Sequence, residues 1–210
     1  MSGLADVRTD NDSPKRLAVL EAAGRLFVTH GYGAVSMDVI AREAGVSKAT
    51  LYAHFASKDR LFATIITEAC HQGVAAATQL AAAEAGTDIR AVLTGLGGRV
   101  LRFLLAPRTL AIHRVVIAEV ARFPELGAVF YENGPGRSRG QFTAWLQRQT
   151  AIGRLAAADP DLAADQFLGM LRGNLYHRAL LGIGPPATQD EIDSAAVATV
   201  DTFLRAYSAA

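Results

Sequence analysis

Lys48 and Thr50 stand near the start of a short helix that the sequence predicts from Ser47 to His54. Both side chains can reach a donor or acceptor on the edge of a base pair. Leu51 and Phe55 form the opposite, apolar face of this helix and would anchor it from behind. The spacing therefore predicts a helix with a polar outward face that is able to enter the major groove of DNA.

Groups suited to phosphate binding flank this helix, namely Ser36, Ser47, Tyr52, His54 and Lys58. Their hydroxyl, imidazole and ammonium groups can donate to phosphate oxygens, and helix N-termini near Ser36 and Ser57 add free N–H groups. Ala49 offers only an apolar contact, for instance with a thymine methyl. Other roles stay open: Tyr52 could be a core-edge aromatic, His54 could cap its helix, and Lys58 could be a solvated residue at a helix start.

Three predicted helices position these residues. The first begins near Pro14, repeats apolar residues at three and four positions, and ends at Gly31. The second begins after Ser36 and breaks at Gly45. Because the two helices that meet at Gly45 are too short to be stable alone, a long helix after Ser57 must brace them. This is the spacing of a helix-turn-helix.

The remainder of the chain reads as amphipathic helices separated by glycine and proline. The sequence predicts helices at 58–84, 88–105, 109–122, 137–152, 160–182 and 189–207, with a short one at 125–132. We find no strand pattern, so the fold class is all-α. The predicted organisation is a disordered arm at 1–13, a DNA-binding domain at 14–60 and a ligand-binding and dimerisation domain at 61–210.

Polar or aromatic residues embedded in the apolar body helices are candidates for lining a cavity, since a selective cavity is mostly apolar with a few fixed polar groups. The same residues fit hydrogen bonds between helices, and Trp145 fits a plain core. We select His113, Arg114, Phe123, Tyr131, Trp145, Asn174 and His177 as candidate ligand-binding residues, and Tyr176 and Arg178 share their pattern.

Composition and charge exclude a protein that binds nucleic acid through an overall positive charge. Half of the 210 residues are hydrophobic and the net charge is +1. Residues 15–60 carry seven Lys and Arg against four Asp and Glu, so a mildly basic head precedes a mildly acidic body. The single cysteine, Cys70, permits no intrachain disulfide.

Nothing in the pattern indicates catalysis, a metal site or a cofactor. The histidines never stand three or four residues apart, no phosphate-binding loop follows a strand, and adjacent Cys70 and His71 would diverge on a helix. The N-terminus lacks the order of a signal peptide, and no apolar run reaches the roughly 20 residues of a membrane span. The sequence therefore predicts a cytoplasmic protein with no membrane association.

The stretch from Ser36 to Phe62 resembles the DNA-binding region of the TetR family. The matching residues are Ile40-Ala41, Ala44–Ser47, Thr50–Tyr52, His54-Phe55, Lys58 and Leu61, and Ser36 stands where threonine is commoner. The C-terminal part is similar to the AefR-like region of some TetR regulators. Its matching residues are Glu119–Leu126, Phe130-Tyr131, Gly134-Pro135, Asp159-Pro160 and Phe203–Tyr207.

The resemblance implies that Lys48, Ala49, Thr50, Tyr52, His54 and Lys58 contact bases or phosphates. It further implies a homodimer that joins through the last two long helices, with a pocket enclosed by the middle helices. We therefore expect a repressor that a small, largely apolar molecule releases from operator DNA. The alternative is a small-molecule binding or interaction protein whose head no longer binds DNA.

Overall fold

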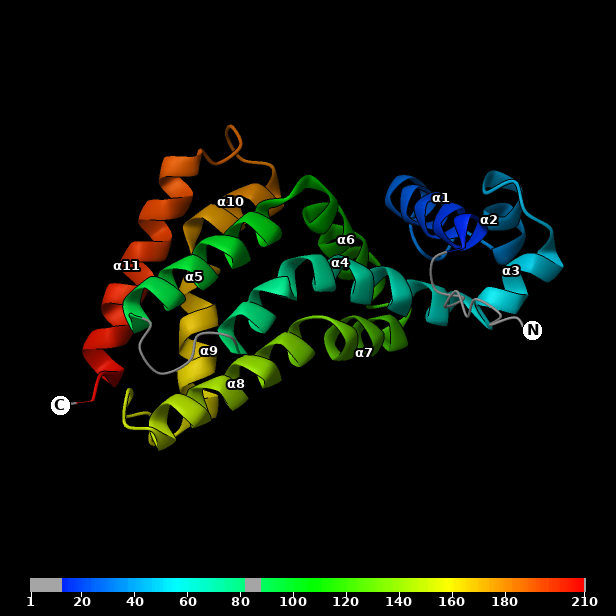
Figure 1. The fold of residues 1–210 in the computed structure, drawn as a ribbon. Helices are drawn as coiled ribbons and strands as arrows, with labels where there is room; N and C mark the ends of the chain where they lie inside the picture. Colours follow the sequence, from blue (N-terminus) through cyan, green and yellow to red (C-terminus); the bar gives the residue numbers. More distant parts are fainter. Residues whose placement is uncertain (1–12, 82–87, 210) are drawn as a thin grey trace, which may run out of the picture.

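The structure is a computed structural model that describes residues 13–81 and 88–209, with side chains described outside 70–81. The predicted arm at 1–13 lies outside the described residues except for Ser13, and so do the side chains of Cys70 and His71. Figure 1 shows an all-helical molecule in which a small head, α1 to α3, stands at one end of a larger body. In the described part, an isolated bridge between Leu155 and Ser208 is the one β-type pairing.

The helices of the head begin at the predicted places because serine side chains cap them. The head consists of α1 (Pro14–His30), α2 (Met37–Glu43) and α3 (Lys48–His54). The hydroxyls of Ser13, Ser36 and Ser47 accept hydrogen bonds from backbone N–H groups three residues on. Gly45, between α2 and α3, has a φ of 66°, which a residue with a side chain rarely adopts.

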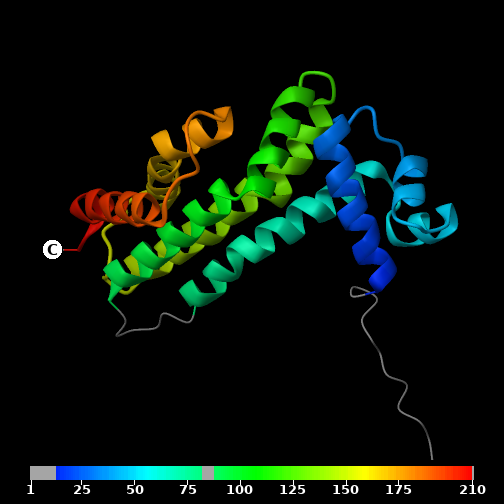
Figure 2. The ribbon, with the colours of Figure 1, turned by 90° about the horizontal axis from the view of Figure 1, so that it is seen from above.

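Helix α4 (Lys58–Ala81) runs out of the head and along the body (Figure 2). It packs against α1 in the head and against α5 (Ile89–Leu105) and α7 (Pro124–Asn133) in the body. One apolar core spans the junction, because Leu51 and Phe62 share it with Val116 of α6 (Pro107–Glu119). The head is therefore joined to the body by continuous packing as well as by the chain.

A second apolar core holds the far end of the body together. It lies between α5, α8 (Pro135–Ala151), α9 (Pro160–Leu171) and α11 (Gln189–Tyr207). Phe167 stands at its centre, with the rings of Phe142 and Phe203 at centroid distances of 5.0 and 5.2 Å. Trp145 stacks on Phe142 and is 1% exposed.

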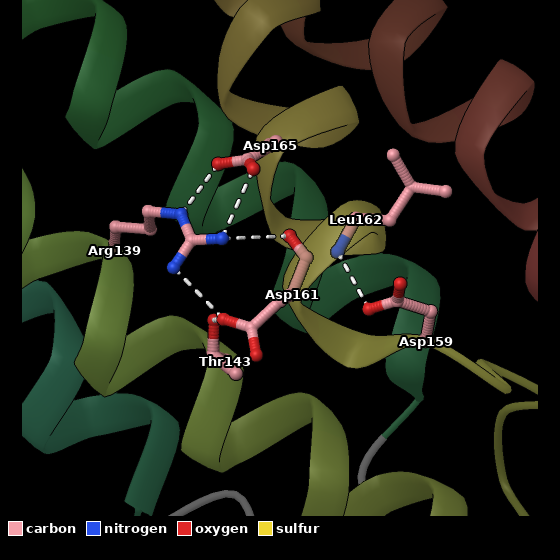
Figure 3. Close-up of polar contacts among 6 residues, drawn as sticks. All are labelled: Arg139, Thr143, Asp159, Asp161, Leu162 and Asp165. Atoms are coloured by element: carbon pink, nitrogen blue, oxygen red, sulfur yellow. Dashed lines mark hydrogen bonds and ion pairs between the residues drawn. The ribbon is translucent and has the colours of Figure 1, made fainter.

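An exposed polar cluster fastens α8 to α9 beside this core (Figure 3). The Arg139 guanidinium donates to both carboxylate oxygens of Asp165, at 2.5 and 3.0 Å, and to Asp161 at 2.8 Å. Hydrogen bonding to Arg139 lowers the pKa of Asp165, so the pair stays charged at neutral pH. This two-point contact fixes the orientation of α9 on α8.

Three predicted helices differ from the structure in an informative way. The helix expected over 160–182 is two helices, α9 and α10 (Asn174–Leu181), because the chain leaves helical geometry at Gly173, where ψ is −150°. Helices α6 and α8 each begin two residues earlier than expected, at Pro107 and Pro135. Proline suits the first helical turn because its missing N–H would have no partner there.

Candidate DNA-binding surface and internal cavity

Helix α3 presents its polar face to solvent, as the sequence predicts. Leu51 is fully buried and Phe55 is 3% exposed, so these two side chains fix the helix from behind. Lys48 and Ala49 are exposed, and Thr50 is half-buried near the surface. The helix is therefore held in the orientation that a groove-entering helix requires.

Lys48 is tied to the neighbouring helix of the head. Its Nζ lies 2.6 Å from Oδ2 of Asp38 in α2, and both side chains are more than half exposed. An ion pair this exposed contributes little to stability, and either partner can turn toward another charge. Lys48 places a positive charge at the start of α3, and the carboxylate of Asp38 partly offsets it.

Hydroxyl groups surround the start of α3. The Oγ of Ser47 accepts from the backbone N–H of Thr50 and lies 2.9 Å from the Thr50 Oγ1. Ser36 caps α2 in the same way and is exposed. A hydroxyl that accepts a capping bond keeps its own proton for another acceptor. Ser36 can therefore donate to a phosphate oxygen, and Ser47 can do so when Thr50 is the donor of their hydroxyl pair.

Tyr52 and His54 lie toward the other end of α3. Tyr52 is 50% exposed, so half of its surface is open to a partner. His54 is half-buried, with its ring centroid 6.3 Å from that of Phe55. The structure thus gathers six of the predicted DNA-contact residues, Ser36, Ser47, Lys48, Ala49, Thr50 and Tyr52, on the exposed part of the head, with His54 beside them.

Lys58 is placed differently from the prediction. Its ammonium donates to the backbone oxygens of Tyr32 and Val35, at 2.8 and 3.1 Å, and lies 4.1 Å from the centroid of the Tyr32 ring. Burial lowers the pKa of Lys58. This side chain fastens α4 to the turn between α1 and α2, and the placement does not support the expected phosphate contact.

A cavity of about 310 Å³ opens between α4, α5, α6, α7, α8, α9 and α10. Most of its wall is aliphatic or aromatic, which suits a largely apolar molecule. The apolar lining consists of Ile66, Ala69, Val100, Phe103, Leu104, Ile112, Val116, Ile117, Phe130, Gly134, Pro135 and Leu168. The polar and phenolic lining consists of Thr109, His113, Tyr131, Ser138, Arg172 and Tyr176.

The cavity brings together His113, Tyr131 and Tyr176 from the sequence-predicted set. The other candidates lie elsewhere among the described residues. Trp145 belongs to the second core, and Phe123 packs edge-on against Tyr32 at a centroid distance of 5.7 Å. Those two predictions are therefore wrong: the apolar surroundings that suggested a cavity are solid packing.

The remaining three candidates do not line the cavity. Arg114 is exposed and donates to the backbone oxygens of Ala179 and Leu180, each at 2.8 Å, so it joins α6 to α10. His177 is exposed, and its Nδ1 lies 3.0 Å from the Gly173 carbonyl. Asn174 is exposed at the start of α10. Of these three residues, Arg114 makes the contact between helices that the sequence offered as the alternative to a cavity role.

Sequence analysis missed three polar lining residues, Thr109, Ser138 and Arg172, of which Arg172 is the charged one. It follows the last residue of α9 as the C-cap, next to Gly173. The available signal was an arginine directly after the apolar residues Leu168, Met170 and Leu171, where a charge needs a partner or a function. Sequence spacing alone did not show which way the residue would point.

His113 and Tyr176 form a polar pair on the cavity wall. The His113 Nδ1 lies 2.8 Å from the Tyr176 hydroxyl, and the Phe130 ring meets the imidazole edge-on at a centroid distance of 5.2 Å. Burial, assisted by the charge of Arg172, lowers the pKa of His113 to about 4. The imidazole is therefore neutral at physiological pH, with one N–H donor.

Comparison with known protein families accounts for both parts of the molecule. The model of the bacterial regulatory proteins of the tetR family matches residues 19–65. The model of the C-terminal domain of AefR-like transcriptional repressors matches residues 91–209. The chain belongs to the TetR family of transcriptional regulators. The members of this family are DNA-binding regulators and not enzymes, as its relatives also indicate.

Several relatives cover nearly the whole chain. The helix-turn-helix regulator Rv1556 of Mycobacterium tuberculosis is 28% identical over 193 residues, which is 91% of this chain and 89% of that protein. A TetR-family regulator from Pseudomonas syringae has a TM-score of 0.71 at 28% identity, covering 95% of this chain and 98% of its own. The flavonoid-responsive regulator FrrA has a TM-score of 0.72 at 34% identity, covering 92% and 97%.

The described residues contain neither a membrane-spanning helix nor a cluster of metal ligands. None of their helices is long and apolar enough to cross a membrane. Among them, no group of three His, Cys, Asp or Glu side chains could hold a metal ion.

Proposed function

We propose that this TetR-family regulator is a cytoplasmic homodimeric repressor that leaves its operator when a small, largely apolar molecule occupies the cavity. The observation that carries the proposal is that one helix serves both regions. Helix α6 lines the cavity with Ile112, His113 and Val116. At its C-terminal end, Glu119 and the following Phe123 contact the turn between α1 and α2.

This contact gives a physical route from cavity to head. A Cβ atom on Gly31 would lie too close to the Glu119 carboxylate, and one on Gly33 too close to the Phe123 ring. Because the Phe123 ring packs directly against Gly33 and Tyr32, we expect a displacement of α6 to be transmitted to the turn that precedes α2. A ligand shifts an equilibrium only if it binds one of two states more tightly, and a cavity bordered by α6 allows that difference.

In the proposed complex, Lys48 and Thr50 read base edges, Ala49 makes an apolar contact, and Ser36, Ser47, Tyr52 and His54 hold phosphates. The dimer forms through the segment after Pro160, where the apolar side chains of Leu162, Leu181, Ile183 and Val197 are 44% exposed or more. Two heads related by a twofold axis would read half-sites about 34–36 Å apart.

Two kinds of relative support the direction of regulation and the responsiveness to a ligand. The C-terminal model is that of repressors, and FrrA is by name responsive to flavonoids. The activator FasR of Mycolicibacterium smegmatis is 48% identical, but over 52 residues, or 25% of this chain. That match is only about as long as the DNA-binding domain. Whether a regulator represses or activates depends instead on where its operator lies.

The test is selection of operator sequences from a random pool by the full chain, followed by binding titrations at several salt concentrations. Enrichment of a short palindrome and a steep salt dependence are expected. Lys48→Ala and Thr50→Ala should mainly relax sequence preference. Each should reduce the difference in binding free energy between the operator and a mismatched sequence by about 1–3 kcal/mol per lost base contact. Absence of any enriched sequence would instead favour a binding protein whose head has lost DNA binding.

A further inference from the structure

The cavity has one charged end. Arg172 follows α9, and Tyr176 lies in the first turn of α10, so both are held at the junction of these helices. His113 reaches the same place from α6, with its Nδ1 2.8 Å from the Tyr176 hydroxyl. Arg172 lines the same cavity as both, and its positive charge disfavours protonation of His113 and favours ionisation of Tyr176.

Arg172 has no anionic partner among the residues whose side chains the structure describes, 13–69 and 88–209. Its position after the last turn of α9 partly stabilises the positive charge of Arg172, because the C-terminal end of a helix carries partial negative charge. A guanidinium presents five N–H donors in a planar fork that matches a carboxylate in two hydrogen bonds.

The neighbours of Arg172 are also suited to an acceptor. Both His113 and Tyr176 are neutral at physiological pH, because burial disfavours their charged forms. If the His113 Nδ1–H donates to the phenol oxygen, the Tyr176 O–H is free to donate to a ligand. This end of the cavity then presents a guanidinium and a hydroxyl to one bound group and adds no negative charge.

The rest of the lining differs in character. Phe103, Val116 and Ile117 line the cavity without a hydrogen-bonding side chain. Ile117 and Tyr131 are 61% and 56% exposed, so they lie where the cavity meets solvent. The cavity thus pairs a cationic end with a long apolar surface.

We propose that the effector is an amphipathic acid, an apolar molecule with one carboxylate that Arg172 and Tyr176 bind while the apolar part lies along α6. This inference rests on the proposed role of the cavity as the effector site. It goes further by fixing the charge of the effector and the end of the cavity at which that charge lies.

The test uses isothermal titration calorimetry of the full chain with two matched pairs of probes. These are decanoate with methyl decanoate, and naphthalene-2-carboxylate with its methyl ester. At least one acid should bind about tenfold to a hundredfold more tightly than its ester, which is the range expected for a hydrogen bond to a charged group. Equal binding of acid and ester, or failure of both acids to bind, would overturn the proposal.

Variants locate the charge. Arg172→Gln should lose the preference for acid over ester, and Arg172→Lys should keep part of it because the charge remains without the fork. Arg205→Gln, at an exposed residue in the last turn of α11, is the matched control and should leave binding unchanged. If Arg172→Gln does not fold, Tyr176→Phe supplies the answer, since it removes only the hydroxyl and should weaken acid binding. If the variant that folds, Arg172→Gln or Tyr176→Phe, binds the acid as tightly as the original protein, the assignment is wrong.

Operator release is measured separately, by fluorescence anisotropy of labelled DNA. An acid that binds at Arg172 without releasing DNA would count against the proposed function and leave the ligand assignment intact. Release by the esters alone would support the proposed function and overturn the assignment.

Discussion

The ring of Phe123 lies against Gly33 so closely that a Cβ atom on the glycine would be 2.7 Å from the ring Cε2. The same ring packs edge-on against Tyr32. Lys58 lies over the Tyr32 ring and donates to the Tyr32 carbonyl. The segment that follows α6 therefore packs against the turn that precedes α2, and that turn is bonded to the start of α4.

Gly33→Ala should disturb this lock. The added methyl group forces the Phe123 ring to move, so we expect a loss of about 1–3 kcal/mol in the free energy of unfolding. Phe123→Leu in the same chain should recover part of that loss, because the smaller side chain makes room. Urea denaturation measures both, with Gly140→Ala as control, since no atom lies within 4 Å of a Cβ atom there. Additive losses in the double variant would contradict the contact.

Gly45→Ala tests the turn of the helix-turn-helix. The φ of 66° costs a residue with a side chain about 1–2 kcal/mol, although nothing lies within 4 Å of the added Cβ atom. Gly45→Asn should cost less, because asparagine adopts this conformation more readily. Thermal denaturation compares the three proteins. If alanine and asparagine cost the same, the conformation of the turn is not the reason for the glycine.

Lys58→Met separates a structural role from a phosphate contact. The substitution leaves the carbonyls of Tyr32 and Val35 without their donor, so we expect the free energy of unfolding to fall by about 1–3 kcal/mol. The slope of log affinity against log salt concentration should stay the same. A slope reduced by about one unit would show that Lys58 binds phosphate after all.

Asp38→Asn should strengthen binding to every DNA sequence. It removes a negative charge from the surface that faces the duplex and frees Lys48 from its ion pair. Folding stability should change by less than about 1 kcal/mol, because exposed ion pairs contribute little. Anisotropy titrations with specific and unrelated DNA measure the effect. Weaker binding would mean that Asp38 is needed to hold Lys48 in position.

His113 makes stability depend on pH. Its pKa is about 4 in the folded protein against an ordinary value of 6.5. Between these values the unfolded chain binds a proton that the folded chain does not, so stability falls as pH decreases through this window. From pH 7.5 to 5 the loss should be about 2 kcal/mol. Glutamine does not titrate, so the free energy of unfolding of His113→Gln, measured by urea denaturation, should fall by about 2 kcal/mol less over the same pH range. The exposed His177→Gln is the control, and equal pH profiles of all proteins would refute the account.

The sequence was informative wherever a residue acts through its immediate neighbours in the chain. Ser13, Ser36 and Ser47 cap helices because each hydroxyl reaches a backbone N–H three residues away. Leu51 and Phe55 are buried because their spacing places them on one face of α3. These local rules were enough to predict the head, its outward polar face and most helix boundaries of the body.

Tertiary packing decided which polar residues of the body face the cavity. His113 and Arg114 are adjacent in the chain, yet one lines the cavity and the other joins α6 to α10. Trp145 and Phe123 fit a cavity wall as well as a core by sequence, and both are packed. The sequence by itself determined the family, the helices and the face of α3, because these depend on local spacing. Only the meeting of α6, α9 and α10 placed Arg172 beside His113 and Tyr176, because that depends on how distant helices pack.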